Sequence, residues 1–156
     1  MSEPAHEALA GHAFLAGLPA ESLELVAEHA QLFTFKPGAL LFREGSSADL
    51  VYLITKGHVA IEVHAPNREA IVVETLQAGN VVGLSWAAPP FRYQFDARAI
   101  DAVEAVGVDG ARLRASLAEN PALGYHVLHR LTGVILERLQ ATRLRLLDLY
   151  GTSDAR

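Results

Sequence analysis

Short runs of β-branched and aromatic residues, separated at close intervals by turn residues, constrain the fold of this chain more than any other feature. The turn signals are Lys36-Pro37-Gly38, Glu44-Gly45-Ser46, Lys56-Gly57, Pro66-Asn67, Gly79-Asn80 and Pro89-Pro90. The runs between them include Val51–Ile54, His58–Val63, Ile71–Leu76 and Val103–Val108. Short strands at a spacing of about 8–12 residues are typical of antiparallel sandwiches and barrels. We therefore expect a mainly β fold, with an antiparallel double-stranded β-helix, a jelly-roll-like β-roll of about eight strands, over residues 31–109.

One of these runs shows a regular alternation of apolar and polar side chains. Val59, Ile61 and Val63 alternate with His58, Ala60, Glu62 and His64. A period of two residues indicates a strand with one face in the core and the other in solvent.

Helical periodicity appears first near the N-terminus. In the segment 12–30, which we expect to be helical, residues 20–30 have the clearest amphipathic pattern. Its apolar positions, at i, i+3, i+4 and i+7, are Leu23, Val26, Ala27 and Ala30. This spacing predicts one amphipathic helix before the strands begin.

Two further helices are expected over residues 110–150. Asp109-Gly110 opens a short one. Asn120-Pro121 then combines a helix-capping residue with proline at the first helical position of a second helix. That helix can run to Tyr150, where Gly151 offers a C-terminal stop. At 1.5 Å per residue it would be on the order of 40 Å long.

The second helix has an apolar stripe along its length. The stripe consists of Leu128, Leu131, Ile135, Leu139, Leu146 and Leu149, with Thr142 at its missing position. Because the helix is longer than a domain of this size is wide, its own domain covers only part of the stripe. We therefore expect a homodimer in which two copies of the 121–150 helix pack along each other.

The composition is that of one globular domain. Of the 156 residues, 51% are hydrophobic and 20% are charged, which excludes a disordered chain. No segment approaches the roughly 18 apolar residues of a membrane span, and the N-terminus lacks the basic and apolar regions of a signal peptide. Cysteine is absent, so disulfides, thiol catalysis and cysteine-held metal sites are excluded. We expect a cytoplasmic protein that does not bind membranes.

Charge is distributed unevenly along the chain, whose net charge is −5. Residues 1–110 have a net charge of −8 and residues 111–156 a net charge of +3. Nucleic-acid binding usually requires a basic domain or stripe, and most of this chain is acidic. Only six residues follow Tyr150, whereas a helix-turn-helix module needs on the order of 60. We therefore expect no direct DNA binding.

Several motifs together resemble the cyclic-nucleotide-binding domain family. They are Phe14-Leu15, Lys36-Pro37-Gly38, Leu41–Gly45, Val51–Ile54, Lys56–Val59, Gly79–Gly83 and Ala97-Arg98-Ala99. The run Arg138–Thr142 is similar to the dimer helix of the cAMP-receptor regulators. The resemblance spans about residues 12–150 and implies a β-roll with flanking helices, usually dimeric, that senses a small ligand inside the roll.

The resemblance also implies where a ligand would bind. In the family, a short helix after the position of Gly83 aims its free N–H groups at a phosphate, which suits a helix N-terminus. The expected ligand-binding residues are a turn (Gly83, Leu84 and Ser85), aromatic walls (Trp86, Phe91 and Tyr93), an anion partner (Arg92) and two helix residues that would close the site across the dimer (Thr142 and Arg143).

Three side chains depart from the phosphate-binding segment of the family, here residues 83–94, which we call the cassette. The glutamate that binds the ribose hydroxyl in the family is Leu84 here, and the phosphate-binding arginine aligns with Tyr93. Gln94 replaces the small residue that follows. The loss of the glutamate and the loss of the arginine would each weaken the binding free energy of a cyclic nucleotide by roughly 1–3 kcal/mol. We therefore expect a non-enzymatic regulatory domain with a degenerate cassette, which does not bind cAMP or cGMP tightly and either senses another small anionic ligand or acts as a regulatory subunit.

An alternative interpretation leaves the roll without a cavity. Its interior would be filled by Trp86, Phe91, Tyr93 and Phe95. The chain would then be a ligand-free module that binds a partner enzyme. The chain resembles lone rolls that accompany redox enzymes such as nickel–iron hydrogenases, and this resemblance implies a redox enzyme as one candidate partner.

Neither a metal site nor catalysis is expected. His58 and His64 are six residues apart, which along a strand is about 20 Å and too far to share an ion. His126 and His129 are at i and i+3 on a helix without a third ligand at suitable spacing. The run Gly83–Trp86 lacks the second glycine of a nucleophile elbow.

Overall fold

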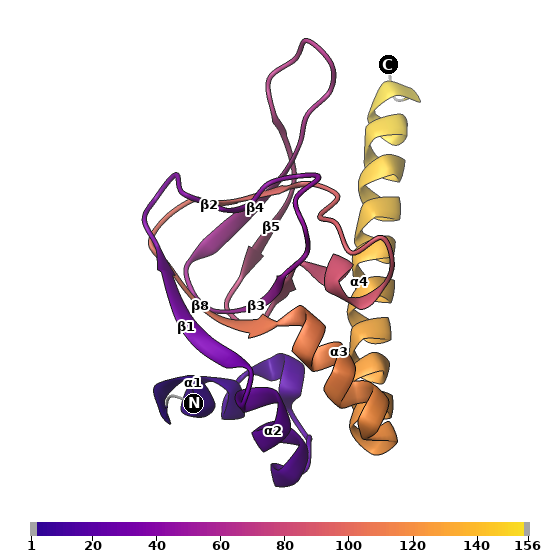
Figure 1. The fold of residues 1–156 in the computed structure, drawn as a ribbon. Helices are drawn as coiled ribbons and strands as arrows, with labels where there is room; N and C mark the ends of the chain where they lie inside the picture. Colours follow the sequence, from indigo (N-terminus) through magenta and orange to yellow (C-terminus); the bar gives the residue numbers. More distant parts are fainter. Residues whose placement is uncertain (1–2, 155–156) are drawn as a thin grey trace.

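The computed structural model of the protein, in which residues 3–154 are described, is a β-roll with helices at one end and along one side (Figure 1). Its helices are α1 (Glu3–Ala10), η1 (Ala13–Leu15), α2 (Ala20–Ala27), η2 (Leu84–Ala87), α3 (Gly110–Glu119) and α4 (Pro121–Asp154). Its strands are β1 (Ala30–Phe35), β2 (Leu40–Phe42), β3 (Leu50–Lys56), β4 (His58–Val63), β5 (Ile71–Gln77), β6 (Val81–Val82), β7 (Asp96–Ala99) and β8 (Val103–Asp109). The predicted mainly β fold with flanking helices and a long C-terminal helix is confirmed.

Two antiparallel sheets of four strands make up the roll. The first sheet has the order β1-β8-β3-β6, and the second has the order β2-β7-β4-β5. The central strand β8 pairs with β1 from Ala30↔Val108 to Phe35↔Val103. In the second sheet, β4 lies between β5 and β7. The predicted strand His58–Val63 is observed with the same bounds.

The first sheet separates two apolar layers. Alternation along β3 sends the side chains of Val51 and Leu53 to one face and that of Tyr52 to the other. On the Tyr52 side lies the roll interior, where its ring contacts that of Phe33. On the other side lies a layer to which five helices contribute: η1 (Phe14 and Leu15), α2 (Val26), η2 (Trp86), α3 (Leu113) and α4 (Val127). We call this second layer the helix layer.

Residues 12–30 form two short helices, η1 and α2, rather than the single helix expected there, and α1 precedes them. Gly17, with φ of +84°, and Pro19 interrupt the segment, and only α2 matches the predicted amphipathic pattern. Ala30 already belongs to β1, so α2 ends before it. Helix α1 was not predicted because its buried side chains, Ala5 and Leu9, form too short a pattern to recognise.

The predicted alternation along β4 is only partly right. Ala60 and Glu62, expected in solvent, are buried, whereas Val63, expected in the core, is exposed. Glu62 is 9% exposed because Arg98 of β7 lies on the same face, and its Nε donates to both carboxylate oxygens at 3.2 and 3.3 Å. Val63 ends the strand at the base of the β4–β5 hairpin, which projects from the roll (Figure 1).

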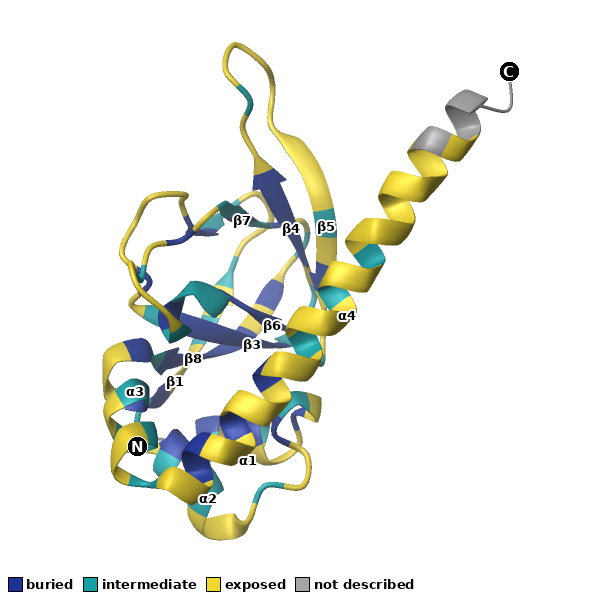
Figure 2. Ribbon diagram, turned by 90° about the vertical axis from the view of Figure 1, so that its right-hand side faces the viewer, coloured by how far each residue is buried: buried dark blue, intermediate teal, exposed yellow. Residues whose placement is uncertain are grey.

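Helix α4 starts at Pro121 as predicted and contains 34 residues, which corresponds to about 51 Å. It continues through Gly151 to Asp154 rather than stopping at Tyr150, since glycine within a helix costs only about 1 kcal/mol. Its first half packs on the body, and its second half projects away (Figure 2). Within residues 3–154, no helix is both long enough and apolar enough to cross a membrane.

The buried ring of His12 predicts a pH dependence of stability. Its Nδ1 accepts a hydrogen bond from the Phe14 amide at 3.1 Å, so Nε2 carries the proton that points to the Ile54 carbonyl at 2.9 Å. Burial lowers the pKa of His12 below its usual 6.5. Protons therefore bind the unfolded chain more readily, and the free energy of unfolding should fall as the pH drops below about 6.5.

Urea denaturation at pH 7.5 and 5.5 measures this effect. The variant His12→Gln, whose neutral amide can donate and accept similarly, should lose much of the difference between the two pH values. The exposed His126 provides the control, and His126→Gln should keep the full difference. Equal pH dependence in the wild type and His12→Gln would contradict the assignment.

Candidate functional site

The turn after β6 has the backbone shape expected of the family. Gly83 has φ of +94°, and a Cβ there would lie 3.2 Å from both the Leu50 carbonyl oxygen and the Tyr93 ring. Glycine is therefore required at this position. The four-residue η2 follows, with Leu84 half-buried against the core and Ser85 half-buried beside it. An alkyl side chain at residue 84 offers no acceptor to a sugar hydroxyl.

Tyr93 lies inside the roll. Its ring stacks face to face on Phe42, with centroids 3.6 Å apart and an interplanar angle of 7°. Its hydroxyl donates to the Leu50 carbonyl at 2.5 Å and accepts from the Leu50 amide at 3.2 Å. Burial raises the pKa of Tyr93, so the phenol stays neutral. Both hydrogen-bonding functions of the hydroxyl are thus engaged within the protein.

Other aromatic rings occupy the same space. We call the set the interior aromatic cluster: Phe33, Phe35, Phe42, Tyr52, Tyr93 and Phe95. Tyr52 meets Phe33 and Phe35 edge to face, with centroids 5.5 and 5.7 Å away. Gly107 makes room for this packing, because a Cβ there would lie 2.4 Å from the Phe33 ring. Burial raises the pKa of Tyr52 to about 12, as expected in a dry interior.

Trp86 lies in the helix layer, on the opposite face of the first sheet from the interior aromatic cluster. Its side chain is 2% exposed and lines the same small apolar space as Val51 and Leu53. Its indole Nε1 is buried and has no hydrogen-bond partner among the residues described. Trp86 and Tyr93, predicted as two walls of one site, are therefore not brought together.

Two arginines in or beside the cassette bind backbone carbonyls. Arg92, the expected anion partner, lies on the surface and donates through Nη1 to the Gly45 carbonyl at 2.9 Å. Arg114 of α3 donates to the Trp86 carbonyl at 2.6 Å. The guanidinium of Arg114 also covers the Phe91 ring, 3.9 Å from its centroid, a cation–π contact. Phe91 thus packs against α3 rather than inside the roll.

Thr142 and Arg143 lie on the exposed part of α4. The hydroxyl of Thr142 donates to the Arg138 carbonyl at 2.9 Å within the same helix. At this level the helix meets the roll through Arg138, which donates to the Val81 carbonyl and lies 3.8 Å from a Glu74 oxygen. Burial lowers the pKa of Arg138, and the Glu74 carboxylate opposes this. Glu74, Val81 and Arg138 line a cleft of about 750 Å³ between α4 and the β5–β6 region, and neither Thr142 nor Arg143 is among its lining residues.

The polar side chains of the second sheet form pairs that the sequence did not indicate. His58 and His64 each bind a different aspartate, at 2.6 Å from Asp101 and 2.8 Å from Asp96. Burial works against ionisation of Asp96, but the Glu44 amide and the His64 ring lower its pKa overall. Asp96 faces His64 only because β7 pairs with β4, a register that spacing along one strand does not give.

The fold and the glycine turn define a class of regulatory β-roll domains with a long C-terminal helix. This chain belongs to the cyclic nucleotide-binding domain family, whose profile matches residues 32–120. It is 27% identical over 146 residues to a CRP-like cAMP-activated global transcriptional regulator of Mycobacterium tuberculosis. That match covers 94% of this chain and 63% of the regulator, so the chain spans less than two thirds of its relative.

Solved structures show the same fold. A protein of Geobacter metallireducens named for cyclic-nucleotide binding is 31% identical with a TM-score of 0.78, and the match covers 89% of this chain and 99% of that one. A cyclic nucleotide-binding domain of Methylobacillus flagellatus is 22% identical with a TM-score of 0.80, over 92% of this chain and 83% of that one. The predicted family is therefore confirmed.

The Tyr93 hydroxyl generates a prediction about stability. Tyr93→Phe keeps the ring stack but leaves the part-buried Leu50 carbonyl and amide without their shared partner, which should lower the free energy of unfolding by about 1–3 kcal/mol. Urea denaturation measures the change. Tyr125 is 67% exposed, so the matched control Tyr125→Phe should change stability by less than about 0.5 kcal/mol. Equal effects of the two variants would show that the Tyr93 hydroxyl contributes nothing.

Proposed function

We propose that this chain is a homodimeric regulatory domain that acts on a partner protein and does not take a cyclic nucleotide inside its roll. The stack of Tyr93 on Phe42 at 3.6 Å supports this most directly, because rings in van der Waals contact occupy the space that a ligand would need. The name of the mycobacterial relative, a transcriptional regulator, supports a regulatory role rather than a catalytic one.

The polar groups of the cassette support the same proposal. Leu84 offers no acceptor to a ribose hydroxyl, and Arg92 is directed to the Gly45 carbonyl on the surface. The Tyr93 hydroxyl is already saturated by Leu50. A cyclic nucleotide would therefore have to displace the ring stack and also leave its own polar groups without partners, at about 1–3 kcal/mol for each.

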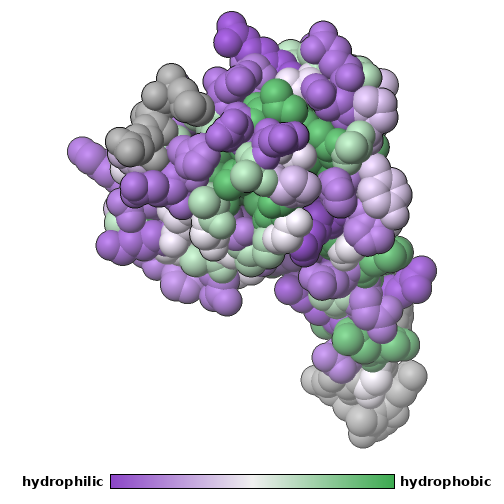
Figure 3. Space-filling model, turned by 90° about the horizontal axis from the view of Figure 1, so that it is seen from below, coloured by the Kyte–Doolittle hydropathy of each residue, from purple (hydrophilic) through white to green (hydrophobic). Residues whose placement is uncertain are grey.

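The two faces of α4 support the dimer. Leu131 of the predicted stripe is 4% exposed and packs on the domain. The other positions of the stripe are exposed: Leu128, Ile135, Leu139, Thr142, Leu146 and Leu149. Together with Tyr125 and Thr132, which are also exposed but were not part of the predicted stripe, they follow alternating steps of three and four residues. We call this set the α4 seam. Such steps are the pattern by which two helices pack along each other, and Figure 3 shows apolar side chains on the projecting part of the helix.

The cleft between α4 and the β5–β6 region supports a second candidate, a sensor of a small anionic ligand. Arg130 and Arg138 line the cleft together with His126 and His129. An anion bound there would compete with Glu74 for Arg138 and so alter the contact between the helix and the roll.

Isothermal titration calorimetry with cAMP, cGMP and inorganic phosphate tests both candidates. For the purified dimer we expect no saturable heat with the cyclic nucleotides up to about 1 mM, equivalent to binding weaker than about −4 kcal/mol. A micromolar Kd that persists in Arg138→Ala would place the ligand in the cassette and overturn the proposal. Binding of a cyclic nucleotide or phosphate that is lost in Arg138→Ala would instead favour the sensor with its site in the cleft.

Analytical ultracentrifugation tests the dimer. The wild type should sediment as a dimer at micromolar concentration, and Leu139→Glu, which places a charge in the α4 seam, should sediment as a monomer. Leu147 is 65% exposed but lies off the seam, so Leu147→Glu should remain dimeric. A monomeric wild type, or equal behaviour of the two variants, would contradict assembly through the seam.

A further inference from the structure

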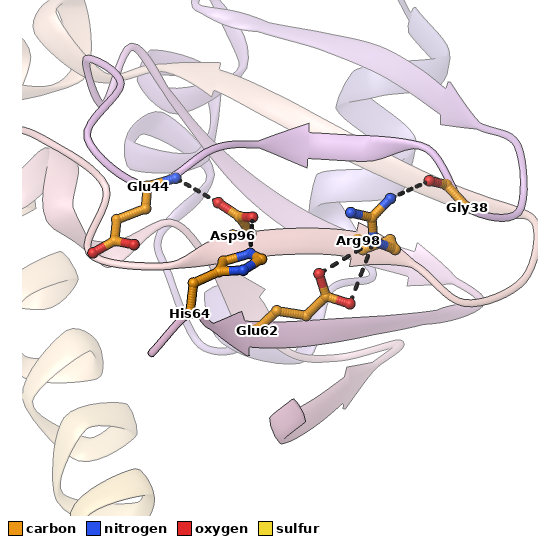
Figure 4. Close-up of polar contacts among 6 residues, drawn as sticks. All are labelled: Gly38, Glu44, Glu62, His64, Asp96 and Arg98. Carbon is orange, nitrogen blue, oxygen red and sulfur yellow. Dashed lines mark hydrogen bonds and ion pairs between the residues drawn. The ribbon is translucent and has the colours of Figure 1, made fainter. Parts of the chain in front are cut away.

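A group of metal-ligating side chains lies on the second sheet, away from the cassette. Glu62 and His64 are two residues apart along β4 and its extension, so they point to the same face. Asp96 of β7 is the direct cross-strand partner of Glu62 and shares that face. Ile61 and Ala97, the neighbouring pair, point the other way into the core. The sheet register therefore gathers the three polar side chains (Figure 4).

Their donor atoms are close enough to share one ion. One ligand atom from each of Glu62, His64 and Asp96 lies within 4.8 Å of the others. The closest pair, His64 Nε2 and Asp96 Oδ2, is 2.8 Å apart. Donors at about 2.1 Å from a common ion lie roughly 3–4 Å from one another, so small side-chain rotations suffice to bring all three into range.

The surroundings hold these donors in place. The Glu44 amide donates to Asp96 Oδ1 at 2.7 Å, which leaves Oδ2 directed at the imidazole. Arg98 orients the Glu62 carboxylate and is itself fixed by a hydrogen bond to a backbone carbonyl at 2.8 Å. Hydrogen bonds from neighbouring residues to the ligand side chains, like these, orient the ligands of metal sites. Two carboxylates against one guanidinium leave an excess of negative charge beside the imidazole, which favours a cation.

We propose that Glu62, His64 and Asp96 form a binding site for a divalent transition-metal cation of the Zn²⁺ or Mn²⁺ class. One imidazole nitrogen and two carboxylate oxygens suit such ions, and the half-exposed His64 leaves the remaining coordination positions to water. The bound ion would tie β4 to β7 at the base of the β4–β5 hairpin. The site is independent of the proposed regulatory function, since none of its residues belongs to the cassette or the α4 seam.

Paramagnetic broadening by Mn²⁺ locates the site directly. In the ¹H–¹⁵N spectrum of the full chain, substoichiometric Mn²⁺ should first broaden the amide signals of residues 62–64 and 95–97, and EDTA should restore them. Zinc titration by calorimetry should then give a Kd that His64→Gln weakens at least tenfold. His58 is the matched control, because it has one aspartate partner but belongs to no three-donor group among the described residues. His58→Gln should leave the Kd unchanged.

Three results would overturn the proposal. The first is no saturable binding of either cation up to about 1 mM. The second is Mn²⁺ broadening centred on His126 and His129 instead. The third is an equal loss of affinity in His64→Gln and His58→Gln. Glu62→Gln keeps the shape of the side chain and tests a second donor, and metal-free thermal unfolding shows whether each variant is folded.

Discussion

The rest of the roll depends on the two hydrogen bonds between the Tyr93 hydroxyl and the backbone of Leu50. They fix the segment after η2 to the start of β3, and the ring stack then fixes it to Phe42 of β2. The backbone of Tyr93 completes the attachment, since its carbonyl accepts from Gly45 at 2.8 Å and its amide donates to Ser46 at 2.9 Å. Tyr93 thus joins the cassette, the β2–β3 loop and the interior aromatic cluster. Its hydroxyl, its ring and its backbone each have a separate partner that fixes its position.

The cassette also reaches the other apolar layer. Trp86 extends through the helix layer, where a Cβ on Gly110 of α3 would lie 3.1 Å from its own Cβ. Arg114 holds the Trp86 carbonyl and the Phe91 ring from the same helix. Because the segment has one aromatic anchor on each face of the first sheet, it cannot move without disturbing both layers. The cassette therefore connects the roll to the helices through contacts in both layers.

The elements that local patterns determine could be predicted from the sequence. The strand His58–Val63 and the start of α4 at Pro121 follow from alternation and from capping chemistry. Side-chain placement across elements could not be predicted, because it depends on the register between strands. Trp86 and Tyr93 are near in sequence but face different layers, and Glu62 is buried only because Arg98 lies across the same face.

The two faces of α4 have different roles: one contacts the roll, and the other carries the seam of the proposed dimer. On its inner face, Arg138 donates to the carbonyl of Val81, two residues before Gly83, where the cassette starts, and it also faces Glu74 of β5. Its outer face presents Leu139, one residue further along the chain, in the α4 seam. Adjacent residues of one rigid helix thus contact the roll and the expected partner helix. In the proposed dimer, a rotation of α4 that changes the packing of the seam would also move Arg138 against β5 and β6, which would couple the dimer geometry to the conformation of the roll.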